Sequence, residues 1–292
     1  MLEGFARKRI PTKEVAINVL HGGSGPPLLL LHGYPQTHAM WRKVAPLLAD
    51  HFTLVIPDLR GYGDSDKPHG LPDHSNYSKR AMAKDQVEVM AALGFDRFAV
   101  AGHDRGARVA HRMALDHPRH VARLAVLDIV PTRTMYARTT REFAKAYYHW
   151  FFLIQPEPFP ETLIGANPEA YLRKHMGGRF AGLAPFAPDG WPEYLRCFGD
   201  PATIHATCED YRAAESIDLV HDDADFGHRK VECPVLVLWG RHGVIERCFE
   251  PLADWREYAG AVSGNSLDCG HYLPEERAED TAQAFVRFFG AA

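Results

Sequence analysis

Short apolar runs separated by amphipathic segments recur along the first half of this 292-residue chain. Most of these runs do not alternate apolar with polar residues, which is typical of strands buried on both faces of a sheet. The segments between them carry apolar residues at helical spacing. Strands that alternate with helices predict a mostly parallel sheet, covered by helices on both faces and built with right-handed crossovers. The expected strands are Glu14–Leu20, Pro27–Leu31, Phe52–Ile56, Phe98–Ala101 and Leu124–Val130.

The alternation stops after Pro131 and returns near the C-terminus. Between residues 135 and 222 there is no convincing buried apolar run, while aromatic residues and prolines are frequent. This composition predicts a mostly helical cap at 135–222, inserted into a core formed by 1–134 and 223–292. The core then continues with a strand in Cys233–Gly240, a weaker strand near Val262 and a terminal helix around Phe285.

The turn Gly102-His103-Asp104-Arg105-Gly106 joins an expected strand to an expected helix. Glycines two residues before and after its centre let strand and helix approach closely and hold the central side chain at the end of the strand. This is the pattern of the nucleophile elbow of α/β-hydrolases, in which serine usually stands at the centre. Here the centre is Asp104. A carboxylate is a poor acyl-transfer nucleophile, but it displaces a leaving group from saturated carbon and forms an ester. The turn therefore predicts an α/β-hydrolase fold and alkyl transfer.

An ester on Asp104 needs a base that activates water against it. We expect His271 in that role, because it lies between the last strand and the terminal helix, where α/β-hydrolases carry their histidine. The base needs a carboxylate to orient it. Asp128 and Glu246 compete, and we favour Asp128 because it interrupts an apolar strand end, where an unpaired carboxylate is unfavourable. Weaker candidates, explained equally well by turns or caps, are Asp58 and Asp268.

Hydrolysis of the ester passes through a tetrahedral oxyanion, which needs backbone donors. The N–H of Arg105, directly after the nucleophile, and the N–H of Tyr34 are expected to supply them. The side chain of His32 is then expected to stabilise its loop. Cys269 is an alternative nucleophile, but no elbow presents it.

Arg105 and Arg108 lie in the first turn of the helix after the elbow, where the macrodipole disfavours a cation by about 0.3–1 kcal/mol. Their planar guanidinium groups are suited to bind a carboxylate above Asp104, and they would keep Asp104 ionised. The alternative is that they only pair with Asp104 or with an acid such as Asp116. We favour a substrate whose carboxylate lies beside its electrophilic carbon, as in a 2-halo acid.

A leaving halide needs hydrogen-bond donors. The expected cap contains an imidazole, an indole and a phenol that can donate hydrogen bonds, on His149, Trp150 and Tyr211 respectively. Packing within the cap is the alternative explanation of these three side chains, and the residues alone favour it.

The formal net charge is −4, from 33 Lys plus Arg and 37 Asp plus Glu, and there is no basic stripe for nucleic acid or an anionic membrane. A small molecule or a protein is the expected partner. No apolar stretch has the length of a signal or membrane span, so a cytoplasmic protein is expected. Five cysteines, an odd number without CxxC spacing, predict reduced thiols.

Together these residues resemble the haloacetate dehalogenases, and most closely the fluoroacetate dehalogenases. The resemblance covers essentially the whole chain. It rests on Gly-His-Asp-Arg-Gly-Ala-Arg at 102–108, His-Gly-Tyr-Pro at 32–35, the proline-rich loop at 57–65, Ala-Tyr-Tyr-His-Trp at 146–150 and Cys-Glu-Asp-Tyr-Arg-Ala-Ala at 208–214.

The resemblance implies a nucleophile, base and acid at Asp104, His271 and Asp128. It implies binding of the substrate carboxylate by Arg105 and Arg108. The resemblance also implies that the halide is bound by the side chains of His149, Trp150 and Tyr211. By the same resemblance we expect a homodimer that needs no metal or organic cofactor and acts on a small halo acid.

Two alternatives stay open. An epoxide hydrolase also uses an aspartate nucleophile on this fold, and Tyr211 with Tyr147 or Tyr148 would supply the phenols that bind the epoxide oxygen. In that enzyme Arg105 and Arg108 would have no evident task. A receptor that binds a small acid without turnover is the second alternative, and an intact nucleophile, base and acid argue against it. The sequence does not rank fluoroacetate against chloroacetate, bromoacetate or larger 2-halo acids.

Overall fold

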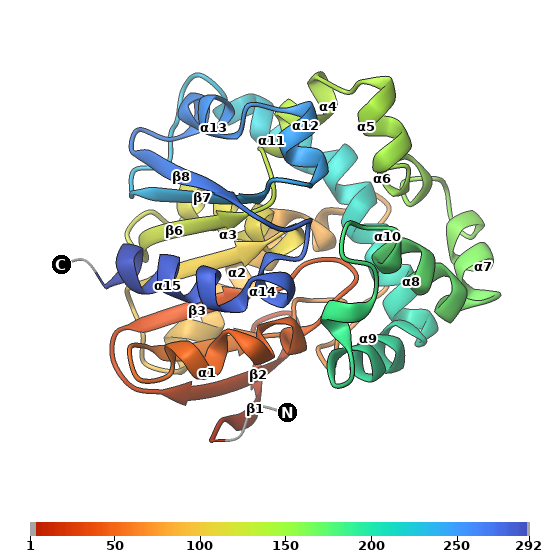
Figure 1. Cartoon of the computed structure of the whole chain (residues 1–292). Helices are drawn as coiled ribbons and strands as arrows, with labels where there is room; N and C mark the ends of the chain where they lie inside the picture. The colour runs from red at the N-terminus through yellow and green to blue at the C-terminus, as the bar shows by residue number, and fades with distance from the viewer. Residues whose placement is uncertain (1–3, 291–292) are drawn as a thin grey trace.

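The computed structural model describes residues 4–290, which fold around one eight-stranded sheet with the order β1-β2-β4-β3-β5-β6-β7-β8 (Figure 1). The pairs β1–β2 and β2–β4 are antiparallel, and all other neighbours are parallel. The predicted α/β fold class is confirmed. The strands are β1 (Ala6–Pro11), β2 (Ala16–Gly23), β3 (Pro27–Leu31), β4 (Thr53–Pro57), β5 (Phe98–His103), β6 (Val121–Leu127), β7 (Val235–Gly240) and β8 (Val262–Leu267).

Burial explains why the apolar runs became the central strands. In β3 the four leucines Leu28 to Leu31 are fully buried, and so are Leu124 to Leu127 in β6. Side chains on both faces of these strands are removed from water, which is the main favourable contribution to folding.

Strand β1 was not expected from the sequence. Its residues are Ala-Arg-Lys-Arg-Ile-Pro, and all except Ile10 are exposed. It forms an antiparallel edge of the sheet, where basic side chains and a proline discourage pairing with another chain. A charged edge strand has no apolar face, so the hydrophobic pattern gave no sign of it.

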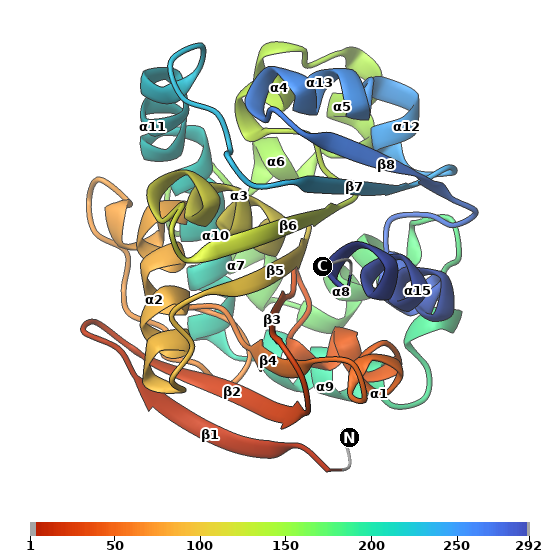
Figure 2. The same cartoon turned by 90° about the vertical axis from the view of Figure 1, so that its left-hand side faces the viewer.

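Helices cover both faces of the sheet (Figure 2). Helices α2 and α3 pack together on one face, while α1 and α15 pack together on the other. Gly94, which lies between α2 and β5, has a φ of 86°, which favours glycine. The helices of the core are α1 (Ala45–Leu48), α2 (Lys79–Ala92), α3 (Arg105–Asp116), α12 (Val244–Cys248), α13 (Pro251–Tyr258), α14 (Leu273–Glu276) and α15 (Ala278–Phe289), with short 3-10 helices at His38–Lys43 and Ser75–Tyr77.

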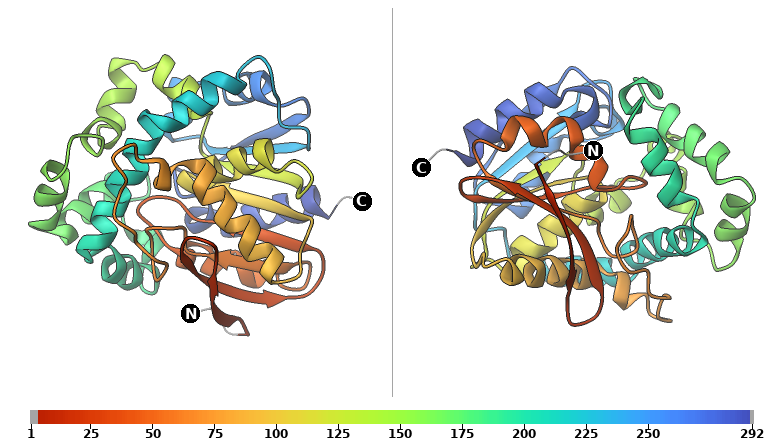
Figure 3. Two further views of the ribbon diagram at one scale, coloured as in Figure 1. Left: turned by 180° about the vertical axis from the view of Figure 1, so that it is seen from behind. Right: turned by 90° about the horizontal axis from the view of Figure 1, so that it is seen from below.

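The segment between β6 and β7 is helical and gathers beyond one edge of the core, on the side opposite the C-terminus (Figure 3). The boundaries 135 and 222 of the expected cap stay a prediction. The helices of this segment are α4 (Thr132–Ala137), α5 (Arg141–Ala146), α6 (His149–Phe152), α7 (Phe159–Gly165), α8 (Pro168–Gly177), α9 (Gly190–Phe198), α10 (Pro201–Glu215) and α11 (Ile217–Asp225), with a 3-10 turn at Ala184–Phe186.

The strand order reverses at β3. The chain leaves β3 for β4 on one side, and β5 then pairs with the other side of β3. In open parallel sheets, loops from the carboxyl ends of the strands diverge at such a point and form a binding site. The loops after β3, β5, β6 and β8 carry Tyr34, Asp104, Asp128 and His271, so the fold brings the predicted site residues to one edge.

Within residues 4–290, the helices are too short or too polar to cross a lipid bilayer. The five cysteines are free, as the odd count and spacing predicted.

Candidate active site

Asp104 stands in a strained turn between β5 and α3. Its φ is 48°, a left-handed value that non-glycine residues rarely adopt. The flanking glycines are required sterically. A Cβ on Gly102 would lie 2.5 Å from the amide nitrogen of Ala107, and a Cβ on Gly106 would lie 2.2 Å from the carbonyl oxygen of His32. Strain of this kind persists at functional sites because the surrounding structure enforces it.

His271 lies between two carboxylates. Its Nδ1 is 2.6 Å from Oδ2 of Asp128, while its Nε2 is 3.9 Å from Oδ2 of Asp104. The other oxygen of Asp128 accepts a hydrogen bond of 2.9 Å from the Gly240 amide, so Asp128 is fixed from both sides. This arrangement orients the imidazole and leaves Nε2 facing Asp104 across a gap that one water molecule bridges in general-base catalysis.

The competing acids lie elsewhere. Glu246 is exposed and accepts a hydrogen bond from the Trp239 indole. Asp58 is buried and accepts from the amide and ring of His38, so it stabilises the loop after β3. Asp268 is exposed and pairs with His242. The structure therefore brings Asp128, and none of these three, to His271.

Cys269 does not have the properties of a nucleophile. Its thiol is buried, and burial raises its pKa far above the ordinary value, which disfavours the thiolate.

The Tyr34 amide donates a hydrogen bond of 3.0 Å to Oδ1 of Asp104. This close approach needs Gly33, because a Cβ there would lie 2.5 Å from the Cβ of Asp104. The Arg105 amide begins α3, and its part as the second donor stays a prediction. His32 accepts a hydrogen bond from the Leu59 amide through Nε2, which fits the loop-stabilising role expected for it.

The carboxyl group of Asp104 is held in its ionised form. Burial raises its pKa, but the electrostatic influence of the neighbouring groups, His271 foremost and Arg108 and Arg105 among others, outweighs burial and holds the pKa below its ordinary value. Asp104 is only 4% exposed, so a buried carboxylate faces the site.

Arg105 is fully buried and is bound by an aspartate that the sequence did not reveal. Its Nε and Nη2 donate to Asp210 of α10 at 3.0 Å and 2.7 Å, and Nη1 has no partner. Asp210 also accepts a hydrogen bond of 2.6 Å from Tyr62 and pairs with Lys79. The alternative that Arg105 only pairs with Asp104 or Asp116 is not what the structure shows.

Arg108 is buried, and no carboxylate within residues 4–290 pairs with it. Its Nη1 donates to the Val130 carbonyl at 3.1 Å and to the Thr132 hydroxyl at 2.9 Å, while Nε has no partner. Burial, and after it the neighbouring Arg105, lower the pKa of Arg108. A buried cation without a counterion favours the arrival of an anion.

Near these arginines, three buried polar atoms that can donate hydrogen bonds have no partner among residues 4–290: Nδ1 of His149, Nε1 of Trp150 and the hydroxyl of Tyr211. Arg105 lies over the Tyr211 ring at 4.1 Å, and Arg108 lies over the Trp150 ring at 4.7 Å. The His149 and Tyr211 rings are 5.6 Å apart. Burial lowers the pKa of His149 and raises that of Tyr211, so each stays neutral and keeps a proton to donate.

His103, next to the nucleophile, was not singled out from the sequence. Its Nε2 donates a hydrogen bond of 2.7 Å to the carbonyl of His271. Burial lowers the pKa of His103 to about 3, which keeps the ring neutral. Its place in Gly-His-Asp was the available signal, and its function is to fix the backbone of the loop that carries His271.

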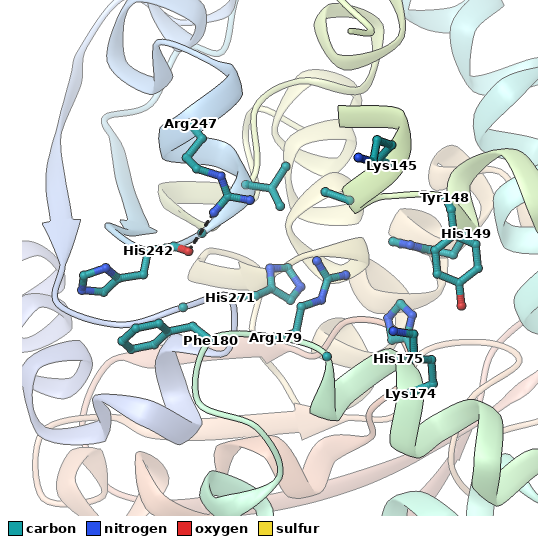
Figure 4. A pocket seen from close by; sticks show the side chains of 15 residues that line it. Lys145, Tyr148, His149, Lys174, His175, Arg179, Phe180, His242, Arg247 and His271 are labelled. Carbon is teal, nitrogen blue, oxygen red and sulfur yellow. Dashed lines mark hydrogen bonds between the residues drawn. The ribbon is translucent and has the colours of Figure 1, made fainter. Parts of the chain in front are cut away.

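A cavity of about 510 Å³ leads to this site between core and cap (Figure 4). His149 and His271 are part of its wall, so the cavity reaches the buried residues described above. Two further wall residues, His175 in the last turn of α8 and Arg179 just after that helix, were not predicted. Neither stands in a motif, so the sequence carried no signal for them.

Within residues 4–290, one group of side chains has potential metal-ligand atoms close enough together to hold an ion, namely His69, Glu157 and His205. It shares no residue with the site around Asp104.

The chain matches the α/β hydrolase fold family over residues 26–278. It is 49% identical to a fluoroacetate dehalogenase from Burkholderia sp., over 100% of this chain and 96% of that protein. It is 34% identical to a soluble epoxide hydrolase from Corynebacterium sp. (strain C12), over 91% of each. A solved structure of an α/β-hydrolase from Nostoc sp. PCC 7120 is 60% identical and superposes with a TM-score of 0.98 over 100% of both chains.

Proposed function

This chain belongs to the fluoroacetate dehalogenase family of α/β-hydrolases, and from that premise we propose that it hydrolyses haloacetates, fluoroacetate foremost, to glycolate and halide. The observation that carries the proposal is the group of three buried donors without partners beside two arginines, formed by His149, Trp150 and Tyr211. Buried donors are almost always paired, so such a group is best explained by an anion that arrives with the substrate.

In the first step, the Asp104 carboxylate attacks the α-carbon from the side opposite the halogen. A carbon–oxygen bond forms while the carbon–halogen bond breaks, and the bonding electron pair leaves with the halide. The free Nη1 of Arg105 and the free Nε of Arg108 bind the substrate carboxylate. The donors of the cap stabilise the departing halide, and attack from behind inverts a chiral α-carbon.

In the second step, His271 takes a proton from water, and the resulting hydroxide attacks the carbonyl carbon of the Asp104 ester. The oxyanion forms where the Tyr34 amide already donates to Asp104, with the Arg105 amide as the proposed second donor. Asp128 stabilises the imidazolium. Collapse of the tetrahedral intermediate expels glycolate, which takes its proton from His271. Asp104 is left as a carboxylic acid and returns to the carboxylate by releasing one proton to solvent.

These steps use the side chains and backbone amides of this chain together with water, so the proposal includes no metal or organic cofactor. From the resemblance to the family we also propose that the protein is a homodimer. The five free cysteines support a cytoplasmic location.

Epoxide hydrolysis is the second candidate, and the 34% identity to an epoxide hydrolase supports it. Tyr211 and Tyr147 are both buried and would donate to an epoxide oxygen, whereas Tyr148 is 40% exposed and is less suited to do so. Against this candidate, an uncharged epoxide gives no partner to the free nitrogens of Arg105 and Arg108. Haloacetate hydrolysis uses both free nitrogens to bind the substrate carboxylate.

The test is halide and glycolate release from fluoroacetate and chloroacetate by the native protein and by Asp104→Asn. We expect equal amounts of halide and glycolate from the native protein, and release by the variant that is slower by at least about 10³-fold. Chloride without fluoride would restrict the substrate to chloroacetate. No halide from either, with diol from an epoxide, would establish the second candidate. Tight binding of acids without any turnover would establish a receptor.

A further inference from the structure

The wall of the cavity that leads to the site is cationic. Its fifteen lining residues include four lysines or arginines and four histidines, and no aspartate or glutamate is among them. The chain as a whole has a formal charge of −4, so this composition is local to the cavity. A cleft lined by one sign of charge concentrates ions of the opposite sign. The charged members are Lys145, Lys174, Arg179 and Arg247.

Of the four, Arg179 is the one that lies among the histidines of the cavity wall. Figure 4 shows its guanidinium pointing into the cavity, between His271 on one side and His149 and His175 on the other. It lies over the Tyr147 ring at 4.7 Å, and within residues 4–290 it forms no ion pair with a carboxylate. By contrast, Arg247 at the rim pairs with Glu142.

The buried reaction site is reached through this cavity. Asp104, Arg105 and Arg108 are at most 4% exposed, while His149 and His271 belong both to the cavity wall and to the site. An anion that moves from solvent toward Asp104 therefore crosses a cavity whose wall includes Arg179, whereas Arg105 and Arg108 are not part of that wall. An unpaired guanidinium in a partly dehydrated wall attracts a carboxylate more strongly than one in open water.

We propose that Arg179 is a second carboxylate-binding site, which takes small monocarboxylate anions on their way to and from Asp104. It binds the incoming haloacetate before Arg105 and Arg108 do, and it binds the hydroxy acid as it leaves. This inference rests on the proposed function for the identity of the anion, but the binding site itself does not require turnover. Its effect is on capture of the substrate, so Arg179 is not a catalytic residue.

A purely structural role is the competing explanation, because Arg179 packs on Tyr147, whose hydroxyl is 3.5 Å from Nδ1 of His271. The two roles predict different kinetics. Loss of a capture site lowers kcat/KM and its salt dependence while kcat stays unchanged, whereas a disturbed His271 lowers kcat at every salt concentration.

The kinetic test compares native protein, Arg179→Gln and Arg179→Lys by chloride release from chloroacetate at low and high ionic strength. We expect Arg179→Gln to lower kcat/KM about 10-fold at low ionic strength and to flatten its dependence on salt. Arg179→Lys should keep most of both. The matched control is Arg173→Gln, which removes a cation of α8, the helix that precedes Arg179; Arg173 pairs with Glu169 outside the cavity. Unchanged kcat/KM in Arg179→Gln, or an equal loss in Arg173→Gln, would overturn the proposal.

A second measurement separates this proposal from the proposed function. Calorimetric titration with acetate, which carries no leaving group, measures capture without chemistry. We expect the dissociation constant to rise about 10-fold in Arg179→Gln and to stay unchanged in Arg173→Gln. Equal acetate binding by native protein and Arg179→Gln would reject the site even if halide is released. Arg179-dependent acetate binding without any halide release would keep the site and reject the dehalogenase function.

Discussion

Asp210 holds Arg105 by two nitrogens of its guanidinium and leaves the third, Nη1, without a partner. The ion pair links α10 of the helical segment to α3 of the core, and both residues are fully buried. It fixes the direction in which the free N–H points. The carboxylate-binding function proposed for Arg105 therefore depends on an aspartate that never touches the substrate.

We predict that Asp210→Asn weakens both stability and substrate binding. Removing one charge of a buried pair leaves Arg105 uncompensated, which costs about 3–5 kcal/mol of unfolding free energy. KM for chloroacetate should rise because the guanidinium is no longer oriented. Urea unfolding and steady-state kinetics measure the two effects. The control is Asp223→Asn, whose partner is Arg133 at the surface, and which should change stability by less than about 0.5 kcal/mol. Similar results for the two variants would contradict the prediction.

The unfolding free energy should fall as the pH is lowered below 6.5. Burial, and after it the charge of Arg112, lower the pKa of His111 from 6.5 to about 3. Between these values the unfolded chain binds a proton that the folded chain does not, so stability rises with pH in this window and is lost toward pH 3. His111→Phe should reduce this slope by up to about 1.4 kcal/mol per pH unit.

Phenylalanine is the suitable replacement because the ring contacts Trp255 and Tyr258 edge-on, and Nε2 has no hydrogen-bond partner. Urea titrations of native protein and His111→Phe at several pH values provide the measurement. Parallel pH profiles for the two proteins would show that His111 does not titrate as described.

Trp150→Phe should impair defluorination more than dechlorination. The change removes the unpaired indole N–H and keeps an aromatic ring for the Arg108 guanidinium to lie against. Fluoride is the stronger hydrogen-bond acceptor and the poorer leaving group, so we expect kcat for fluoroacetate to fall by about 10²-fold, and kcat for chloroacetate by less. Ion-selective electrodes measure both rates. Equal losses for the two substrates would mean that Trp150 only packs.

Asp128→Asn should block turnover but not the first chemical step. Displacement of the halide needs Asp104 and the arginines, whereas hydrolysis of the ester needs an oriented His271. We expect a burst of one halide per site followed by turnover slowed by about 10⁴-fold. Rapid-quench measurement of halide resolves the two phases. Glu246→Gln, a change to the competing acid, should turn over normally, and a burst in that variant instead would reverse the choice of acid.

The sequence was sufficient for residues whose positions follow from strand order. Asp104, Asp128 and His271 each come after a strand of the parallel sheet, and the carboxyl ends of those strands converge at one edge. Asp210 lies on α10 and Arg179 lies in the turn after α8. Neither could be predicted, because the packing of these segments over the core is not encoded by hydrophobic periodicity.

Around the proposed oxyanion site, too, one contact could be predicted from the sequence and another could not. The Tyr34 amide was predicted from the loop after β3, and the structure places it on Asp104. His103 stood in the motif, but its bond to the His271 carbonyl joins segments 168 positions apart in the sequence, which no local pattern reveals.

The central claim is that Asp104 becomes alkylated during turnover, and mass spectrometry of His271→Asn after exposure to chloroacetate tests it most directly. Without the base, the ester should persist, because water is no longer activated. We predict that the peptide containing Asp104 gains the mass of one carboxymethyl group, in step with the release of one chloride per site, and that Asp104→Asn/His271→Asn gains none. A variant that releases chloride while Asp104 stays unmodified, or that carries the added mass on another residue, would contradict the mechanism.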